Sequence, residues 1–288
     1  MKTLVTGGRG MVGSHFSENC IKLGRGDYDL RRMDNVLEMI RKYNPRKVIH
    51  LAAKVGGLYD NMANQATYFN DNFQMNYNII RACNLLNVPD LTVMLSTCIF
   101  PHEHHVLDVN DIHGGEPHPT NYGYAYSKRM AEVMIRAHND QYGSNYKVVI
   151  PTNIYGEGDN FNLNTAHVIP ALVHKFFKAQ RFGEKVIIKG DGSAIREFVY
   201  APDVAKILEG DYEHKAVISS GKGYRIFEVV ELLKSMSKVT DVEYDYKSTN
   251  GQHIKQTQNQ HPFDYTPLEV GLKRTWDWFS NNYDKARK

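Results

Sequence analysis

The sequence predicts an α/β fold in which a doubly wound parallel sheet is followed by a smaller second lobe. Three observations support this prediction. Short runs of apolar, β-branched residues alternate with longer segments whose apolar residues recur every three or four positions. A glycine-rich turn follows the first short run, and beyond about residue 155 the alternation gives way to loops rich in glycine and asparagine.

The elements of this fold can be assigned in order along the chain. Apolar runs bounded by turn residues predict strands at 2–7, 47–53, 91–96, 146–152 and 185–190. The helical spacing of apolar residues predicts helices near 11–23, 33–43, 66–86, 125–143, 167–180, 225–237 and 267–284. The change of pattern predicts two domains, 1–160 and 161–288, with parts that interleave.

Length and composition exclude several classes of protein. The 288 residues suffice for a large hydrophobic core, which excludes a stapled mini-protein. The net charge of +3 does not favour nucleic acid or a membrane surface as a partner, and no segment resembles a membrane span. The start of the chain lacks the apolar segment of a secretory signal, and three widely spaced cysteines fit a cytoplasmic protein.

A glycine pattern at the end of the first predicted strand indicates a dinucleotide site. The turn reads Gly-x-x-Gly-x-x-Gly, and its candidate cofactor-binding residues are Gly7, Arg9, Gly10, Met11, Val12 and Gly13. Glycine allows a tight turn and a close approach to a pyrophosphate, which free N–H groups at a helix N-terminus attract. The position of these glycines between a predicted strand and a predicted helix favours a cofactor site over a sharp turn without a ligand. We therefore expect a Rossmann-like fold.

The segment that should contact the adenosine ribose departs from the usual pattern. A second strand is expected to end about 20 residues beyond the turn. Residues 24–30 contain no apolar run of sufficient length, so the sequence predicts that this strand is trimmed away. Arg9 and Arg25 are then the candidates for binding a 2′-phosphate, because guanidinium groups pair well with phosphate. For Arg25, a solvent-exposed role is an equal alternative.

Three polar residues indicate a site that reduces a carbonyl. Ser96 ends a predicted strand, and Tyr124 and Lys128 lie four residues apart on one face of a predicted helix. A phenol can donate a proton to a carbonyl oxygen that receives hydride, and a nearby ammonium should lower the pKa of that phenol toward neutrality. The Ser96 hydroxyl would hold the same oxygen. Chance often produces a Tyr-x-x-x-Lys pair, but rarely in this order behind a glycine turn.

With these motifs the chain resembles the extended short-chain dehydrogenase/reductases over almost its whole length. Further motifs carry the resemblance, at residues 52–57, 96–101, 151–156, 159–162, 167–172, 196–198 and 276–279. Within that family the chain is similar to the branch whose members produce GDP-L-fucose. The resemblance implies epimerisation of GDP-4-keto-6-deoxy-mannose at C3 and C5, then reduction of its C4 ketone with NADPH.

The resemblance also implies roles in proton transfer. Cys98 matches the base of the epimerisation and His167 matches the acid, and the pKa values of thiols and imidazoles lie closest to neutrality. Without the resemblance, Cys98 would more often be a buried core residue and His167 a residue bonded to backbone at a helix start. Asn153 matches an element that lines the nicotinamide and the sugar.

For the nucleotide end of the substrate, the resemblance implies three basic residues. Arg196 matches an arginine that contacts the diphosphate sugar. Lys175 stands where bacterial members typically have arginine, and Lys189 stands where the family usually has tryptophan. Asn250 replaces an expected aspartate. These departures leave the identity of the nucleotide base open.

Three interpretations follow from the sequence. The first is an NADPH-dependent epimerase/reductase that makes GDP-L-fucose, and the second is a related enzyme for another NDP-4-keto-6-deoxy sugar. The third, a non-catalytic NADP(H)-binding sensor, has no use for so many reactive groups around one carbonyl. The histidines show no metal-ligand spacing, so no metal is expected. The long helices near 66–86 and 125–143 are where this superfamily usually dimerises, so a homodimer is expected.

Overall fold

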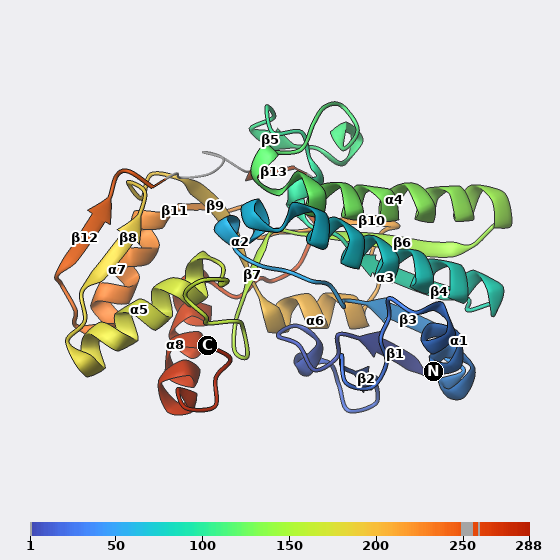
Figure 1. Ribbon diagram of the computed structural model, residues 1–288, viewed down its shortest axis with the longest axis horizontal. Helices are drawn as coiled ribbons and strands as arrows, with labels where there is room; N and C mark the ends of the chain where they lie inside the picture. The colour runs from blue at the N-terminus through green and yellow to red at the C-terminus, as the bar shows by residue number, and fades with distance from the viewer. Residues whose placement is uncertain (1, 249–255, 259) are drawn as a thin grey trace.

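A parallel six-stranded sheet forms the centre of the computed structural model, which describes residues 2–248, 256–258 and 260–288 (Figure 1). The strand order is β10-β6-β4-β3-β1-β2, and every neighbouring pair is parallel. These strands are β1 (Thr3–Thr6), β2 (Ile21–Leu23), β3 (Lys47–His50), β4 (Asp90–Met94), β6 (Asn145–Pro151) and β10 (Lys215–Ile218). The strand order reverses between β1 and β3, which places a ligand crevice at their carboxyl ends. The predicted α/β, doubly wound sheet is confirmed.

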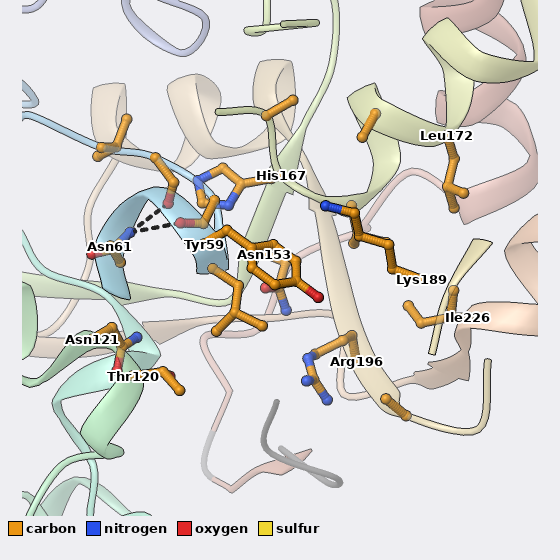
Figure 2. A pocket seen from close by; sticks show the side chains of 18 of the residues that line it. Tyr59, Asn61, Thr120, Asn121, Asn153, His167, Leu172, Lys189, Arg196 and Ile226 are labelled. Atoms are coloured by element: carbon orange, nitrogen blue, oxygen red, sulfur yellow. Dashed lines mark hydrogen bonds between the residues drawn. The ribbon is translucent and has the colours of Figure 1, made fainter. Parts of the chain in front are cut away.

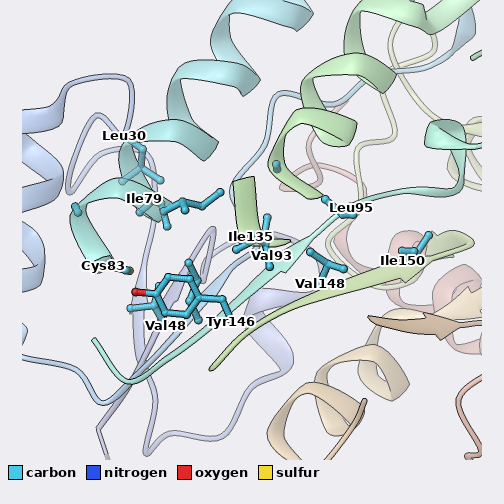
Figure 3. Packing of buried hydrophobic residues seen from close by; sticks show 14 of the residues in the cluster. Leu30, Val48, Ile79, Cys83, Val93, Leu95, Ile135, Tyr146, Val148 and Ile150 are labelled. Carbon is cyan, nitrogen blue, oxygen red and sulfur yellow. The ribbon is translucent and has the colours of Figure 1, made fainter. Parts of the chain in front are cut away.

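Helices cover both faces of this sheet. One face carries α1 (Met33–Tyr43), α3 (Gln65–Leu85) and α4 (Tyr122–Tyr142), and the other carries α6 (Ala201–Glu209). Successive strand residues point to opposite faces, so Leu4 and Val48 join the core under α1, α3 and α4, whereas Val5 and Ile49 join the core under α6. Figure 3 shows the first of these cores, where strand residues such as Val48 meet helix residues such as Ile79.

The connection between β1 and β2 differs from the sequence prediction in two ways. The second strand is present, and it pairs in parallel with β1. The helix predicted over 11–23 is absent, and the segment contains only the 3-10 turn η1 (Gly13–His15) before β2 begins. The prediction of a missing strand is therefore wrong, and the element that this chain has shortened is the helix.

Chain length and a distant helix explain this short crossover. An α-helix advances about 1.5 Å per residue, so a helix over most of residues 7–20 would leave no chain for the turns at its ends. Phe16 fills the space against the sheet instead and is 2% exposed. The N–H of Ser17 donates to Oε1 of Glu209 in α6 at 2.8 Å. A helix from much later in the chain thus covers part of the sheet beside the shortened crossover.

Residues beyond 160 form a second core. Its helices are α5 (Val168–Phe182), α7 (Ile226–Ser237) and α8 (Leu268–Asn282). Aromatic rings hold them together: the centroids of Phe161 and Phe279 lie 4.3 Å apart, and those of Phe177 and Tyr283 lie 4.6 Å apart. β10 returns from this part of the chain to the edge of the central sheet, so the two parts of the chain share that sheet.

Three small sheets and several short connections complete the fold. The sheets contain β11 (Gly223–Arg225), β9 (Ile195–Tyr200) and β7 (Asn153–Tyr155); β12 (Val242–Asp245) and β8 (Val186–Lys189); and β13 (Gln256–Thr257) and β5 (Val106–Leu107). The connections contain α2 (Leu58–Ala63) and 3-10 turns at 97–99, 109–111 and 119–121. Within the described ranges, none of the helices has the length and apolarity needed to cross a membrane.

The other predicted helices and strands are confirmed, with ends within about three residues of the predicted ones. Glycines account for two of these ends, because α4 stops at Gly143 and α5 stops at Gly183, both in the left-handed conformation. Asn250 lies outside the described residues.

The shortened crossover makes Phe16 a stability determinant. We expect Phe16→Ala to lower the free energy of unfolding by about 3–5 kcal/mol, because the side chain is buried between the sheet and α6. Urea unfolding measures this change. The matched control is Phe182→Ala, since Phe182 is 55% exposed, and it should lose less than about 1 kcal/mol. Equal losses in the two variants would show that the crossover does not depend on Phe16.

Candidate active site

The candidate site is a crevice made of two cavities that share a wall. One cavity, of about 590 Å³, extends from the glycine turn after β1, and the other, of about 370 Å³, lies between α2 and the second core. Ser96, Tyr124, Asn153 and His167 line both of them. These four side chains come from the end of β4, the first turn of α4, the start of β7 and the start of α5. The reactive groups therefore lie where the two cavities meet.

The glycine turn is built for close approach of backbone. Gly7 has φ +70°, and a Cβ there would lie 2.8 Å from the backbone nitrogen of Ala52, after β3. A Cβ on Gly13 would strike the carbonyl oxygen of Gly7. Gly7, Arg9, Gly10, Met11, Val12 and Gly13 all line the larger cavity. A turn with accessible backbone and no side chains at these positions fits the pyrophosphate of a dinucleotide, although a 3-10 turn stands where the α-helix was expected.

Two arginines line the far end of the larger cavity, as the sequence suggested. Arg9 pairs with Asp27, with Nη2 and Oδ1 3.0 Å apart. Asp27 also accepts a hydrogen bond from the N–H of Gly24 at 2.7 Å, which fixes the turn after β2. Arg25 lies in this turn and is exposed. A phosphate entering this end of the cavity would meet Arg9 already oriented by a carboxylate.

Arg31 is a third arginine at this end, and the sequence analysis did not select it. It forms ion pairs with Asp29 and, at 3.6 Å, with Asp71 of α3. Hydrogen bonding from Arg31 lowers the pKa of Asp29 to about 2. Lys54 reaches the same Asp71 at 3.4 Å. Arg31 pairs with two carboxylates, whereas Arg9 pairs with one, so Arg9 and Arg25 remain the better candidates for a phosphate.

Lys128 and Tyr124 lie as their spacing predicted, with one difference in electrostatics. The ammonium of Lys128 is buried, donates to the carbonyl of Met94 at 2.8 Å and lies 5.9 Å from the centroid of the Tyr124 ring. Burial lowers the pKa of Lys128 to about 8 and raises the pKa of Tyr124 well above its usual value. The expected lowering of the phenol pKa is therefore wrong here, because desolvation, followed by the charges of Cys98 and Tyr68, raises it. A protonated phenol is the form that can donate a proton.

A buried polar network that the sequence analysis did not select supports Lys128. His50 of β3 hydrogen-bonds to Thr6 through Nδ1 at 2.7 Å and to Asn76 of α3 through Nε2 at 3.2 Å. Asn76 in turn donates to the carbonyl of Ser127, the neighbour of Lys128. Burial, followed by the charge of Lys128, lowers the pKa of His50 to about 3. A neutral imidazole thus ties two strands to the two helices that hold the site.

Cys98 and His167 both line the smaller cavity. Cys98 is 7% exposed, and its N–H donates to Oγ of Ser96 at 3.4 Å, which fixes the turn that carries both side chains. His167 precedes the first residue of α5, and its accessible surface faces the cavity. Desolvation by the surrounding protein lowers the pKa of His167, so the neutral imidazole is favoured. A thiol and an imidazole therefore line one cavity wall together with Tyr124.

The three basic residues line the smaller cavity, and Figure 2 shows Lys189 and Arg196 at the end away from His167. Lys175 of α5 donates to the carbonyl of Ile187 at 2.6 Å, and Arg196 of β9 donates to the carbonyl of Ile195 at 2.7 Å. Burial lowers the pKa of Arg196 to about 10, and burial followed by the charge of Lys189 lowers the pKa of Lys175. No aspartate or glutamate occurs among the described residues that line this cavity. The arrangement favours an anionic ligand.

Asp159 is a buried carboxylate for which the sequence assigned no role. It lines the larger cavity and is 4% exposed. Its Oδ1 accepts the N–H of Asn160 at 2.6 Å, and its Oδ2 has no hydrogen-bond partner among the described residues. Desolvation raises the pKa of Asp159 to about 7, despite the opposing charge of Arg287. The only signal in the sequence was its place in the motif at 159–162.

Asn153 begins β7 beside the reactive groups. Its amide donates to the carbonyl of Glu197 at 2.9 Å, which fixes the side chain where the two cavities meet. The described ranges contain no group of three or more His, Cys, Asp or Glu side chains that could hold a metal ion.

Comparison with known proteins places this crevice in a family. A family profile described as the NAD dependent epimerase/dehydratase family matches residues 3–226. GDP-L-fucose synthase of Dictyostelium discoideum is 36% identical over 311 residues, which cover 99% of this chain and 97% of that protein. The probable GDP-L-fucose synthase of Drosophila melanogaster is 32% identical over 321 residues, which cover 100% of this chain and 99% of that protein.

A solved structure agrees with this placement. The GDP-L-fucose synthetase from Naegleria fowleri, bound to NADP, has a TM-score of 0.90 and 32% sequence identity to this chain. The match covers 99% of this chain and 96% of that one. The likeness therefore extends over almost the whole chain.

The raised pKa of Asp159 predicts a pH dependence of stability. The folded chain holds this proton up to about pH 7, whereas the unfolded chain releases it near pH 4, so the free energy of unfolding should fall as pH rises between these values. Asp159→Asn removes this dependence. The free energy of unfolding, measured with urea, should decrease from about pH 5 to about pH 8 by roughly 2 kcal/mol more in the wild type than in the variant.

The control for this measurement is Asp241→Asn, because Asp241 is exposed and lies outside both cavities. It should keep the pH dependence of the wild type. An Asp159→Asn variant with unchanged pH dependence would show that Asp159 is ionised in the folded chain at neutral pH.

Proposed function

Since the chain belongs to the NAD-dependent epimerase/dehydratase family, we propose that it converts GDP-4-keto-6-deoxy-mannose to GDP-L-fucose by epimerisation at C3 and C5 and reduction at C4. One observation carries this proposal. Tyr124, Ser96 and His167 line the junction between a dinucleotide cavity and a cationic cavity, and Cys98 lines the cationic cavity on the same turn as Ser96. Both reactions depend on the same ketone, so their proton-transfer groups must lie around one position in the site.

NADPH is the cofactor of this reaction, and it supplies the hydride when bound. The bare backbone at Gly7 and Gly13 would hold the pyrophosphate, and Arg9 and Arg25 would hold the 2′-phosphate. Asn153 lies where the cavities meet and would line the nicotinamide and the sugar. The residues of the larger cavity thus match the parts of a phosphorylated dinucleotide.

In the reduction, Tyr124 donates its proton to the C4 oxygen. The raised pKa keeps this phenol protonated until the oxygen gains charge. Ser96 donates a hydrogen bond to the same oxygen, and Lys128 places a positive charge beside the phenol. Product formation leaves a hydroxyl at C4 and a phenolate that the Lys128 ammonium stabilises.

In the epimerisation, Cys98 removes a proton from C3 or C5, and His167 returns one to the opposite face of the sugar. Both carbons lie beside the C4 ketone, so removal of either proton gives an enolate whose oxygen occupies the position that Ser96 and Tyr124 stabilise. Thiol and imidazole have pKa values that allow exchange near neutral pH. One oxygen site therefore serves both reactions.

The diphosphate of the substrate would lie among Arg196, Lys175 and Lys189. Three cations that line one cavity favour two phosphate groups, and the guanidinium of Arg196 can bind two oxygens at once. These cations do not determine which reaction the sugar undergoes. The groups where the two cavities meet determine it.

We also propose that the protein is a homodimer through α3 and α4. These two long helices pack against one another and leave apolar side chains exposed, including Tyr77 on α3 and Met130 and Val133 on α4. Exposed apolar faces on neighbouring helices favour a four-helix contact with a second copy. The cytoplasmic location and the domain boundary at 160/161 stay predictions.

The function is tested by separating its two reactions. Wild-type protein should consume NADPH with GDP-4-keto-6-deoxy-mannose and yield GDP-L-fucose with deuterium at C3 and C5 in D₂O. Cys98→Ser should lose deuterium uptake and accumulate a reduced product unchanged at C3 and C5. Tyr124→Phe should slow reduction by about 10²-fold, because the proton donor is gone, and keep its NADPH affinity.

Cys98→Ser leaves the groups of the reduction in place, so it controls for a general loss of the site. A wild type that binds NADPH but turns over no 4-keto nucleotide sugar would favour the sensor. Deuterium uptake by Cys98→Ser at the wild-type rate would remove Cys98 as the base, and equal NADPH oxidation by Tyr124→Phe would remove the reductase assignment.

Cofactor selection gives a further prediction. Arg9→Ala should lower the ratio of kcat/KM for NADPH to that for NADH by about tenfold, because Arg9 lies at the end of the cavity where the adenosine phosphate would bind. Arg25→Ala should have a smaller effect, since Arg25 is exposed on a turn. Arg181→Ala is the control, because Arg181 ends α5 outside both cavities. An undiminished NADPH preference in Arg9→Ala would contradict this role.

A further inference from the structure

A cation–π contact crosses the smaller cavity. The ammonium of Lys189, on β8, lies 4.0 Å from the centroid of the Tyr59 ring, on α2. Both residues line the cavity, and they come from its opposite walls. In Figure 2 the Tyr59 ring reaches across the cavity toward Lys189, between the end that carries His167 and the end that carries Arg196. A nucleotide sugar that joins these two ends must pass this contact.

The position of Tyr59 is fixed by its helix. The side chain of Asn61 donates to the carbonyls of Gly56 and Gly57, at 2.7 and 3.1 Å, and so closes the start of α2. The N–H of Gly57 donates to the carbonyl of Thr165 at 2.8 Å, and a Cβ on Gly57 would strike the carbonyl of Ala166. The short helix is therefore tied to the loop before α5. Tyr59 projects from a rigid support, with 38% of its surface exposed.

Lys189 has a different character from Tyr59. It is exposed, its flexible stem can move the ammonium, and the cavity around it has positive charge from Lys175 and Arg196. The π face of an aromatic ring carries partial negative charge, so it attracts an ammonium when no anion is present. A phosphate oxygen carries a full negative charge and competes strongly for the same ammonium.

We propose that Tyr59 is a substrate-contacting residue and that the diphosphate of the substrate displaces Lys189 from its ring. Lys189 then pairs with a phosphate oxygen, and the uncovered Tyr59 ring packs against the nucleoside diphosphate sugar. This inference rests on the proposed function and adds Tyr59 to it as a determinant of substrate affinity.

GDP binding in the presence of NADP⁺ tests the proposal, with titration calorimetry on the full chain. Tyr59→Leu should weaken GDP about tenfold, whereas Tyr59→Phe, which keeps the ring, should stay within about threefold of the wild type. Lys189→Gln should also weaken GDP about tenfold. The KM for the nucleotide sugar should rise in parallel in Tyr59→Leu, with kcat and the KM for NADPH within about twofold of the wild type.

The double variant tests the displacement itself. In each single variant the ligand no longer has to break the Tyr59–Lys189 contact, and this gain partly offsets the lost contact to the ligand. The double variant loses both contacts to the ligand but has this gain only once. Its loss of affinity should therefore exceed the product of the two single losses, by about two- to fivefold. Tyr246→Leu and Lys185→Gln are matched controls outside the cavity, and both should bind GDP as the wild type does.

Two results would overturn the inference. GDP affinity within twofold of the wild type in Tyr59→Leu would show that the ring does not contact the ligand. A double variant whose loss equals or falls below the product of the single losses would show that Lys189 is not displaced. Both results are distinct from failure of the proposed function, in which the wild type would neither bind GDP nor turn over the nucleotide sugar.

Discussion

The close approach of the glycine turn to the end of β3 is the constraint on which the site depends. Gly7 passes so near Ala52 that any side chain would collide with backbone, and Gly13 passes equally near Gly7. These approaches keep the ends of β1 and β3 together while their following segments leave in opposite directions. The space between those segments is the larger cavity. The reactive groups at its inner end are then placed by β4 and β7 and by the starts of α4 and α5.

Desolvation sets the charge of the reactive groups. Desolvation by the surrounding protein raises the pKa of Tyr124 and lowers the pKa of His167, so both side chains are held neutral around pH 7. Neutral donors cost less to desolvate than ions, and their hydrogen bonds strengthen in surroundings of low dielectric constant. Charge in the free site is instead concentrated on Lys128, Arg196 and the lysines near it. The site is thus prepared for a negative charge on one oxygen and for anions at its two ends.

The sequence predicted the elements whose signals are local. α1 and α7 follow their apolar periodicity almost to the residue, and the strand ends place Ser96 as expected. The first crossover could not be predicted in this way. Val12 and Phe16 lie four residues apart, as in a helix, but each packs singly against a core that α6 completes. β2 is three residues long, too short for any pattern to reveal. The sequence analysis did not select Tyr59, because only the folded chain brings this residue opposite Lys189.

Reaction and recognition depend on different stretches of the chain. The groups that act on the ketone come from the end of β4 and the starts of α4 and α5, where backbone groups hold Ser96 and Lys128 in place. The cations that receive the diphosphate come from α5, β8 and β9, around the second core. Substitutions in that second group act on how the diphosphate is held, at a distance from the groups around the ketone. The departures at Lys175 and Lys189 belong to this group. The contacts to the diphosphate can therefore vary while the groups that act on the ketone stay in place, and the contact between Lys189 and Tyr59 lies among those variable contacts.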